Sequence, residues 1–173
     1  ELERRAPPGR FVVDMAPGHA NIGRLHADTG DFSAAEREYG RAVDLFTGLP
    51  DRERTAQAIS ANATALKRLG AVLMRRQAYA ESEQRYLQAL ALDEAGLRLD
   101  DRPQTRFDLT FTLSDLALVR ALMHRLADAE VLWRRALAIR EEAWAADPRD
   151  VRALNGVAVL YGRLGSAAQT RHD

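Results

Sequence analysis

The chain has 173 residues, of which 46% are hydrophobic, 29% charged and only 6% aromatic. This length is enough for one domain with a substantial core. The low aromatic content favours helices packed through small residues over an aromatic-rich β core. The 25 basic and 25 acidic residues cancel to a formal charge of zero, which argues against strong attraction to nucleic acid. Cysteine is absent, so disulfides, thiolate zinc sites and cysteine nucleophiles are excluded.

The first 17 residues contain Pro7, Pro8, Gly9 and Pro17, and we expect a linker or the frayed end of a preceding element there. The segment RFVVDM could add a turn or a short helix. A first residue of Glu suggests a fragment of a longer protein. The start ELERRAPPGR lacks the apolar stretch of a signal peptide, and no run approaches the roughly 18 apolar residues of a membrane span. We therefore expect a cytoplasmic protein.

Paired helices are expected along the rest of the chain, as a single domain over residues 18–166 followed by a tail at 167–173. The first helix of each pair is predicted at about 19–29, 52–76, 104–123 and 150–164. The second helices are predicted at about 33–47, 79–98 and 126–146. Pro50, Pro103 and Pro148 separate the pairs, because proline lacks the amide proton that a continuing helix needs.

Three helix starts carry sequence signals. Ser33 followed by Glu36 has the spacing of a capping box, in which side chains satisfy the free amide groups at a helix start. Asp51 and Asp150 precede two further predicted helices and are plausible N-caps.

A pattern of small and large residues recurs along these pairs. A small residue stands in each first helix, at positions spaced 47, 47 and 41 residues apart: Gly23, Gly70, Ala117 and Ala158. Each second helix carries two small residues seven positions apart, which places them on one face: Ala35 and Ala42, Ser82 and Ala89, Ala129 and Ala136. A large residue lies between them, namely Tyr39, Tyr86 or Trp133, and Phe32, Tyr79 or Leu126 opens the helix. Recurrence of this kind indicates a solenoid of stacked hairpins.

The pattern resembles the tetratricopeptide repeat (TPR), and the resemblance covers about residues 19–166. The turn glycine of that family is kept at Gly30 and Gly165 but replaced by Gln77 and His124. The family's leading tryptophan is absent, with His19, Leu66, Leu113 and Leu154 at that position. The period of about 42–47 residues exceeds the usual one of about 34, so longer helices are expected. The predicted fold is an all-α solenoid of antiparallel helical hairpins, with three full repeats and one terminal helix.

Catalytic patterns are missing from the sequence. The four histidines, His19, His26, His124 and His172, form no HExxH pair. His26 lies near Asp28, but a packed or solvated histidine explains it better than a metal contact. Neither a nucleophile elbow nor a phosphate-binding glycine loop occurs. We therefore expect no enzymatic activity, no cofactor and no metal.

The resemblance to the TPR family implies a concave groove, lined by the first helices, that holds a peptide or a partner protein. The groove residues expected by position are Arg24, Asp28, Lys67, Met74, Arg75, Ser114, Leu118, Asn155 and Arg163. Four cations among them would form a basic rim, and Met74, Leu118 and Leu122 an apolar floor, which suits an acidic and partly apolar peptide. Alternatively, the arginines are ordinary solvated side chains and Leu118 and Leu122 belong to the core.

A second function remains open, because the fourth repeat stops after one helix. Its apolar residues, Leu154, Val157, Leu160, Tyr161 and Leu164, would leave an edge suited to a homodimer. The segment ALAIREEAWAADPRDVRALNGVAVLYGRLG also resembles repeat arrays that follow the catalytic domain of some bacterial serine/threonine kinases. That resemblance suggests a regulatory or scaffolding part of a larger bacterial signalling protein. RNA-binding helical repeats are disfavoured by the neutral charge.

Overall fold

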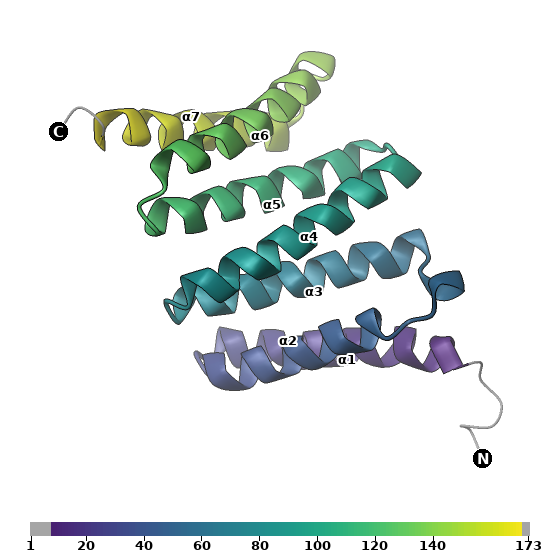
Figure 1. Cartoon of the computed structure of the whole chain (residues 1–173). Helices are drawn as coiled ribbons and strands as arrows, with labels where there is room; N and C mark the ends of the chain where they lie inside the picture. Colours follow the sequence, from purple (N-terminus) through teal and green to yellow (C-terminus); the bar gives the residue numbers. More distant parts are fainter. Residues whose placement is uncertain (1–7, 171–173) are drawn as a thin grey trace. The chain divides into compact units, whose positions relative to one another are not determined.

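A computed structural model describes residues 8–170, and this part of the chain is all-helical, without a β-strand. Its helices, labelled in Figure 1, belong to two units. The first unit holds α1 (Pro8–Asp28), α2 (Phe32–Thr47), α3 (Ala56–Arg75) and α4 (Tyr79–Leu99). The second unit holds α5 (Pro103–Leu122), α6 (Leu126–Ala146) and α7 (Val151–Thr170). Within each unit, every helix packs against the next one along the chain, so the predicted arrangement of antiparallel hairpins is confirmed.

The turn inside each hairpin has the same backbone conformation. Gly30, Gln77 and His124 have φ angles of 82°, 62° and 60°, which lie in the left-handed region that favours glycine. Directly after Gln77, the amide of Ala78 donates to the carbonyl of Leu73. The residues that follow Gly30 and His124 form the equivalent hydrogen bond. These bonds satisfy carbonyl groups at the helix end. The left-handed turn is therefore kept in the two repeats that lack the glycine.

Close contact between the two helices of a hairpin depends on the predicted small residues. A Cβ atom added to Gly70 would lie 2.9 Å from the Tyr86 ring, and one added to Gly23 would lie 2.9 Å from the Tyr39 ring. In the third hairpin Ala117 is fully buried and Trp133 is 4% exposed. The six small residues of the second helices are also fully buried. The predicted packing is thus confirmed in three hairpins, whereas Ala158 on α7 is exposed.

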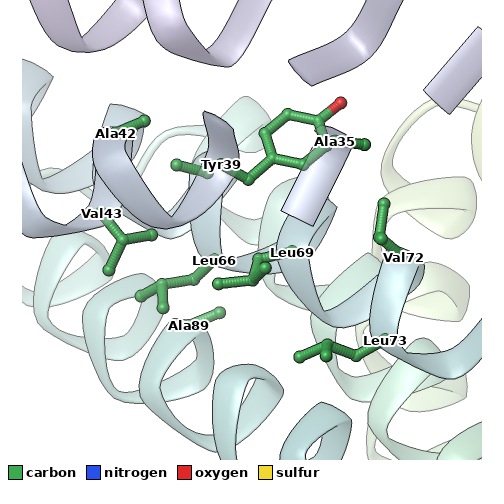
Figure 2. Close-up of a cluster of buried hydrophobic side chains, with 10 residues drawn as sticks. Ala35, Tyr39, Ala42, Val43, Leu66, Leu69, Val72, Leu73 and Ala89 are labelled. Atoms are coloured by element: carbon green, nitrogen blue, oxygen red, sulfur yellow. The ribbon is translucent and has the colours of Figure 1, made fainter. Parts of the chain in front are cut away.

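The core of the first unit lies among α2, α3 and α4 (Figure 2). Helix α2 contributes Tyr39 and Val43, and α3 contributes a stripe that includes Leu66, Leu69 and Leu73. Residues spaced by three and four positions lie on one face of a helix, which is why this stripe reaches both neighbouring helices.

The first helix begins earlier than the sequence indicated. Helix α1 starts at Pro8 rather than near residue 19, and it continues through Pro17. Proline is tolerated at a helix start, where its missing N–H would have no intrahelical acceptor. Residues 8–17 therefore lie in a helix, which includes the RFVVDM segment where a turn or short helix was expected, and residues 1–7 lie outside the described part. Whether residues 18–166 form one domain stays a prediction.

Other helix ends differ in detail. Helix α2 is capped by Asp31, which accepts from the amide of Ala34, rather than by a Ser33 capping box. Asp51 lies in a short 3-10 helix (Asp51–Glu53), and Thr55 caps α3. Asp150 does cap α7, because its side chain accepts from the amides of Arg152 and Ala153. Helix α7 runs to Thr170, so the predicted turn at Gly165 and the predicted helix end at residue 164 are wrong, whereas the tail at 167–173 stays a prediction.

Candidate functional site

The groove residues predicted in the first unit contact neighbours within that unit. Arg24 and Asp28, both exposed on α1, form an ion pair with N–O distance 3.1 Å. The Arg75 guanidinium lies 5.8 Å from the centre of the Phe32 ring, and Met74 is half-buried.

Lys67 also has a partner in the first unit. Its Nζ donates to both carboxylate oxygens of Asp93 on α4, at 3.3 Å each. The exposed fraction of the side chain is 17% for Lys67 and 6% for Asp93. This ion pair joins α3 to α4, so the Lys67 charge is already neutralised within the hairpin.

Three of the four groove residues predicted in the second unit line one cavity. This cavity, of about 440 Å³, lies between α5 and α7 and is bordered by Ser114, Asn155 and Arg163. We call it the α5–α7 cavity. Its wall also includes two apolar side chains, Phe111 and Val159, whose exposed fractions are 48% and 54%. Leu118, the fourth predicted residue, is half-buried and does not border this cavity.

Hydrogen bonds fix the polar side of this cavity. Arg163 on α7 donates to both the backbone oxygen and the hydroxyl of Ser114 on α5, each at 3.0 Å. The indole Nε1 of Trp133 on α6 donates to the same Ser114 carbonyl at 3.3 Å. All three helices of the unit therefore meet at Ser114, which gives the cavity a defined wall.

A buried arginine that the sequence analysis did not single out also borders this cavity. Arg140 on α6 is only 5% exposed. Its Nε donates to the Thr110 hydroxyl at 2.7 Å, and a terminal nitrogen donates to the Arg152 carbonyl at 3.4 Å. The guanidinium carbon lies 3.6 Å from the centre of the Phe107 ring and 5.1 Å from that of Phe111. These contacts hold the group by hydrogen bonds and by cation–π attraction.

Arg140 lacks an acidic partner. Within residues 8–170, no carboxylate forms an ion pair with it. Burial lowers the pKa of Arg140, and the more distant charges of Asp150 and Asp108 partly oppose that effect. Arginine nevertheless keeps its proton under all ordinary conditions, so a positive charge is buried at the edge of the α5–α7 cavity.

The repeat itself contains the signal that could have identified Arg140. It stands 47 residues after Asp93, which in turn stands 47 after Phe46. All three are buried, with exposed fractions of 4% for Phe46, 7% for Asp93 and 5% for Arg140. A position that holds phenylalanine in one copy of the repeat is expected to be buried in every copy. A charged residue at that position in another copy therefore predicts a buried charge.

The described residues contain no group of three or more His, Asp or Glu side chains that could hold a metal ion. His26 lies 3.9 Å from Asp31, and His19 lies 2.7 Å from Glu38, so each is accounted for by a single carboxylate. No helix between residues 8 and 170 has the length and apolar character needed to cross a membrane.

Comparisons with known proteins concern the fold. No protein-family model matches this sequence, and no curated protein matches it either. The chain is similar to the crystal structure of BtubC (BKLC) from P. vanneervenii, with a TM-score of 0.66 and 18% sequence identity. That match covers 96% of this chain and 62% of BtubC, so the chain spans less than two thirds of the BtubC length. The crystal structure of MamA protein matches with 18% identity over 89% of this chain and 86% of MamA, at a TM-score of only 0.37.

A structural similarity at 18% sequence identity is evidence for the fold alone. Together with the three hairpins, the similarity to BtubC shows that the chain has an all-α helical-repeat fold of three antiparallel hairpins and one terminal helix. The left-handed turns and the buried small residues are the local features on which this fold depends.

Proposed function

We propose that the chain is a protein-interaction module that binds an acidic and partly apolar peptide segment of a partner protein in the α5–α7 cavity. One observation carries this proposal: the cavity places the exposed side chains of Phe111 and Val159 beside the cations of Arg140, Arg152 and Arg163. Apolar surface with a few placed polar groups is typical of a binding site. Stacked helical repeats create such surfaces between neighbouring first helices.

The proposal includes a non-catalytic role within a larger protein. A regulatory or scaffolding part of a bacterial signalling protein, such as the region behind a kinase domain, fits the helical-repeat fold. In the first unit, Arg24, Asp28, Met74 and Arg75 are proposed as further partner contacts.

The test is a selection of random ten-residue peptides on the full chain, with Val159→Glu as the disrupting variant. A carboxylate at this position repels an acidic peptide and removes apolar contact, so we expect at least tenfold weaker binding of the selected peptides. Val131→Glu is the matched control, because Val131 on α6 is 67% exposed and lies outside the cavity. Equal binding by all three proteins would contradict the proposal.

A second candidate function is self-association through α7. Val157 and Leu160, which the sequence analysis placed on the edge, are buried. Val151, Leu154 and Tyr161 are 64%, 42% and 56% exposed, and their spacing places them on one face of the helix. An apolar stripe of this kind suits pairing with a second copy of the chain.

Sedimentation velocity over a range of concentrations tests this second function. Self-association through the stripe predicts a dimer that Leu154→Glu converts to monomer. A wild-type chain that stays monomeric at several hundred micromolar, far above a useful dissociation constant, would rule it out.

A further inference from the structure

We propose that Arg140 is the anchor for a carboxylate group of the bound segment. This inference rests on the proposed peptide-binding function and names the chemistry that the α5–α7 cavity selects. The anchor differs from the groove residues expected from the sequence, since it lies on a second helix, α6, and not on a first helix.

The positive charge of Arg140 has no paired carboxylate among residues 8–170. A buried cation is costly unless a negative group compensates it. The acids whose charges act on Arg140 are Asp150 and Asp108, and neither forms an ion pair with it. Asp150 caps α7, and Asp108 accepts from the Gln104 amide at 2.9 Å. An anion from outside the chain would complete the compensation that these two charges supply only in part.

The fold also makes room for this side chain. A Cβ atom added to Gly156 on α7 would lie 3.0 Å from both Cδ and Nε of Arg140. Glycine at position 156 therefore lets α7 approach the guanidinium closely. The Phe107 ring covers one face of the group at 3.6 Å, and Thr110 fixes Nε at 2.7 Å. The orientation of the guanidinium is set before any ligand arrives, which favours binding.

A ligand can reach Arg140 from a cavity that its side chain borders. Arg140 has five N–H groups, of which one donates to Thr110 and one to the Arg152 carbonyl; the others have no acceptor among residues 8–170. The side chain borders the α5–α7 cavity and also a second cavity of about 470 Å³ at the end of the unit where α5 and α7 begin. A planar guanidinium matches a carboxylate with two parallel hydrogen bonds. Arg152 borders both cavities too, 3.8 Å from Asp150. The second cavity is also bordered by Asp101, Glu142 and Asp147, so a carboxylate is expected to approach through the α5–α7 cavity.

The choice of a peptide carboxylate follows from the surroundings. Phe111 and Val159 provide apolar contacts on the approach to Arg140, which suit the side chains flanking an acidic residue. Asp115 also borders this cavity, and its charge disfavours a doubly charged phosphate more than a singly charged carboxylate. Either an Asp or Glu side chain or a free C-terminus could supply the carboxylate, and the experiment separates these two sources.

The experiment follows the Arg140 Nε–H resonance by NMR in the full chain, with Arg140→Lys identifying the signal. Three N-acetylated dipeptides serve as probes at millimolar concentration. Acetyl-Glu-Phe-amide carries a side-chain carboxylate, acetyl-Gln-Phe with a free C-terminus carries a terminal one, and acetyl-Gln-Phe-amide carries none. We expect a saturable shift with one or both acidic probes, and at least tenfold weaker binding of the neutral probe.

Two variants and one ion complete the test. Gly156→Ala displaces the guanidinium while leaving every charge in place, so it should weaken binding of the acidic probe several-fold. Arg134→Glu, at an exposed site on α6 outside both cavities, should bind like the wild type. Inorganic phosphate that binds more tightly than either acidic probe would overturn the assignment to a carboxylate. Equal shifts with the acidic and neutral probes, or no shift with any probe, would show that Arg140 does not anchor a carboxylate. The proposed peptide-binding function would still be tested separately, by the selection of longer peptides.

Discussion

The two units place a charged residue at the same repeat position and use it differently. Asp93 on α4 and Arg140 on α6 stand 47 residues apart and are both buried. Asp93 pairs with Lys67 across the first unit's second hairpin, whereas Arg140 is held by Thr110, a backbone carbonyl and an aromatic ring. One position of the repeat thus closes a hairpin in one copy and, in our proposal, leaves a charge for a ligand in another.

The energetic consequence is that the two residues should respond differently to removal. Breaking a buried ion pair strands the surviving charge, which is strongly destabilising. Removing a buried charge that has no ionic partner strands no opposite charge. Stability measurements on single variants can therefore separate the two arrangements.

The largest effect is expected for Asp93→Ala, which removes the carboxylate that pairs with the Lys67 ammonium. The Lys67 side chain is only 17% exposed, so its charge would stay buried without a partner. We expect a loss of about 3 kcal/mol in the free energy of unfolding, measured by urea denaturation with circular dichroism. The double variant Lys67→Met/Asp93→Leu removes both charges and should recover most of this loss. A single variant within about 0.5 kcal/mol of the wild type, the usual range for surface substitutions, would show that the pair does not hold the hairpin.

The next effect concerns the glycines that allow close contact in each unit. In Gly70→Ala the new Cβ would meet the Tyr86 ring at 2.9 Å, and a buried ring between two helices has little freedom to move. We expect a loss of about 2 kcal/mol from overpacking. In Gly156→Ala the new Cβ meets the flexible Arg140 side chain, so the loss should stay below about 1 kcal/mol, partly offset by helix propensity.

Gly40→Ala is the matched control for these two substitutions, because nothing lies within 4 Å of its added Cβ. We expect it to stabilise the chain by about 0.5 to 1 kcal/mol through helix propensity alone. If Gly70→Ala were as stable as Gly40→Ala, close packing against Tyr86 would not be what requires the glycine.

Much of the fold could be predicted because packing between neighbouring helices imposes a repeated size pattern. For this reason the small residue Gly70 and the large residue Tyr86 could be recognised from the sequence as packing positions. The start of α1 could not be read in the same way, since prolines mark both helix starts and linkers, and α1 accommodates Pro17 within its length. The N-cap Thr55 was missed because a short 3-10 helix precedes α3.

The candidate site was only partly predictable. Ser114, Asn155 and Arg163 were identified by their position in the repeat, and they do border one cavity. Lys67 was placed in the groove by the same reasoning, yet its charge is neutralised by Asp93. Position in a repeat predicts the face of a helix, but it does not predict which long side chain reaches across to a neighbouring helix.

A smaller effect is expected for Arg140→Met, the counterpart of Asp93→Ala in the second unit. An apolar chain of similar length removes an uncompensated charge but loses the contacts with Thr110 and Phe107. These terms oppose each other, so we expect the free energy of unfolding to change by no more than about 1 kcal/mol. Urea denaturation of the two variants side by side is the check. A loss as large as that of Asp93→Ala would mean that Arg140 has a structural role equal to that of the ion pair.

The smallest effect is a pH dependence carried by Glu38, whose charge is half-buried between α1 and α2. Its carboxylate lies 2.7 Å from His19 Nδ1 and accepts from Arg41 at 2.7 Å. The hydrogen bond to His19 is the main reason that the pKa of Glu38 lies below its ordinary value of 4.5, with Arg41 and His26 contributing. Because the folded-state pKa is lowered, the stabilisation is complete above the unfolded-state value and is lost as the pH falls through the folded-state value.

Urea denaturation between pH 5 and pH 3 tests this for the wild type and Glu38→Gln. The wild type should be the more stable at pH 5 by less than about 1 kcal/mol, because the pair is partly open to solvent, and this difference should shrink toward pH 3. Asp44→Asn is the control, since Asp44 is exposed on the same helix and its substitution should give a difference that varies less with pH. A Glu38→Gln difference that stays constant over this range would show that the charge of Glu38 does not stabilise the contact between α1 and α2.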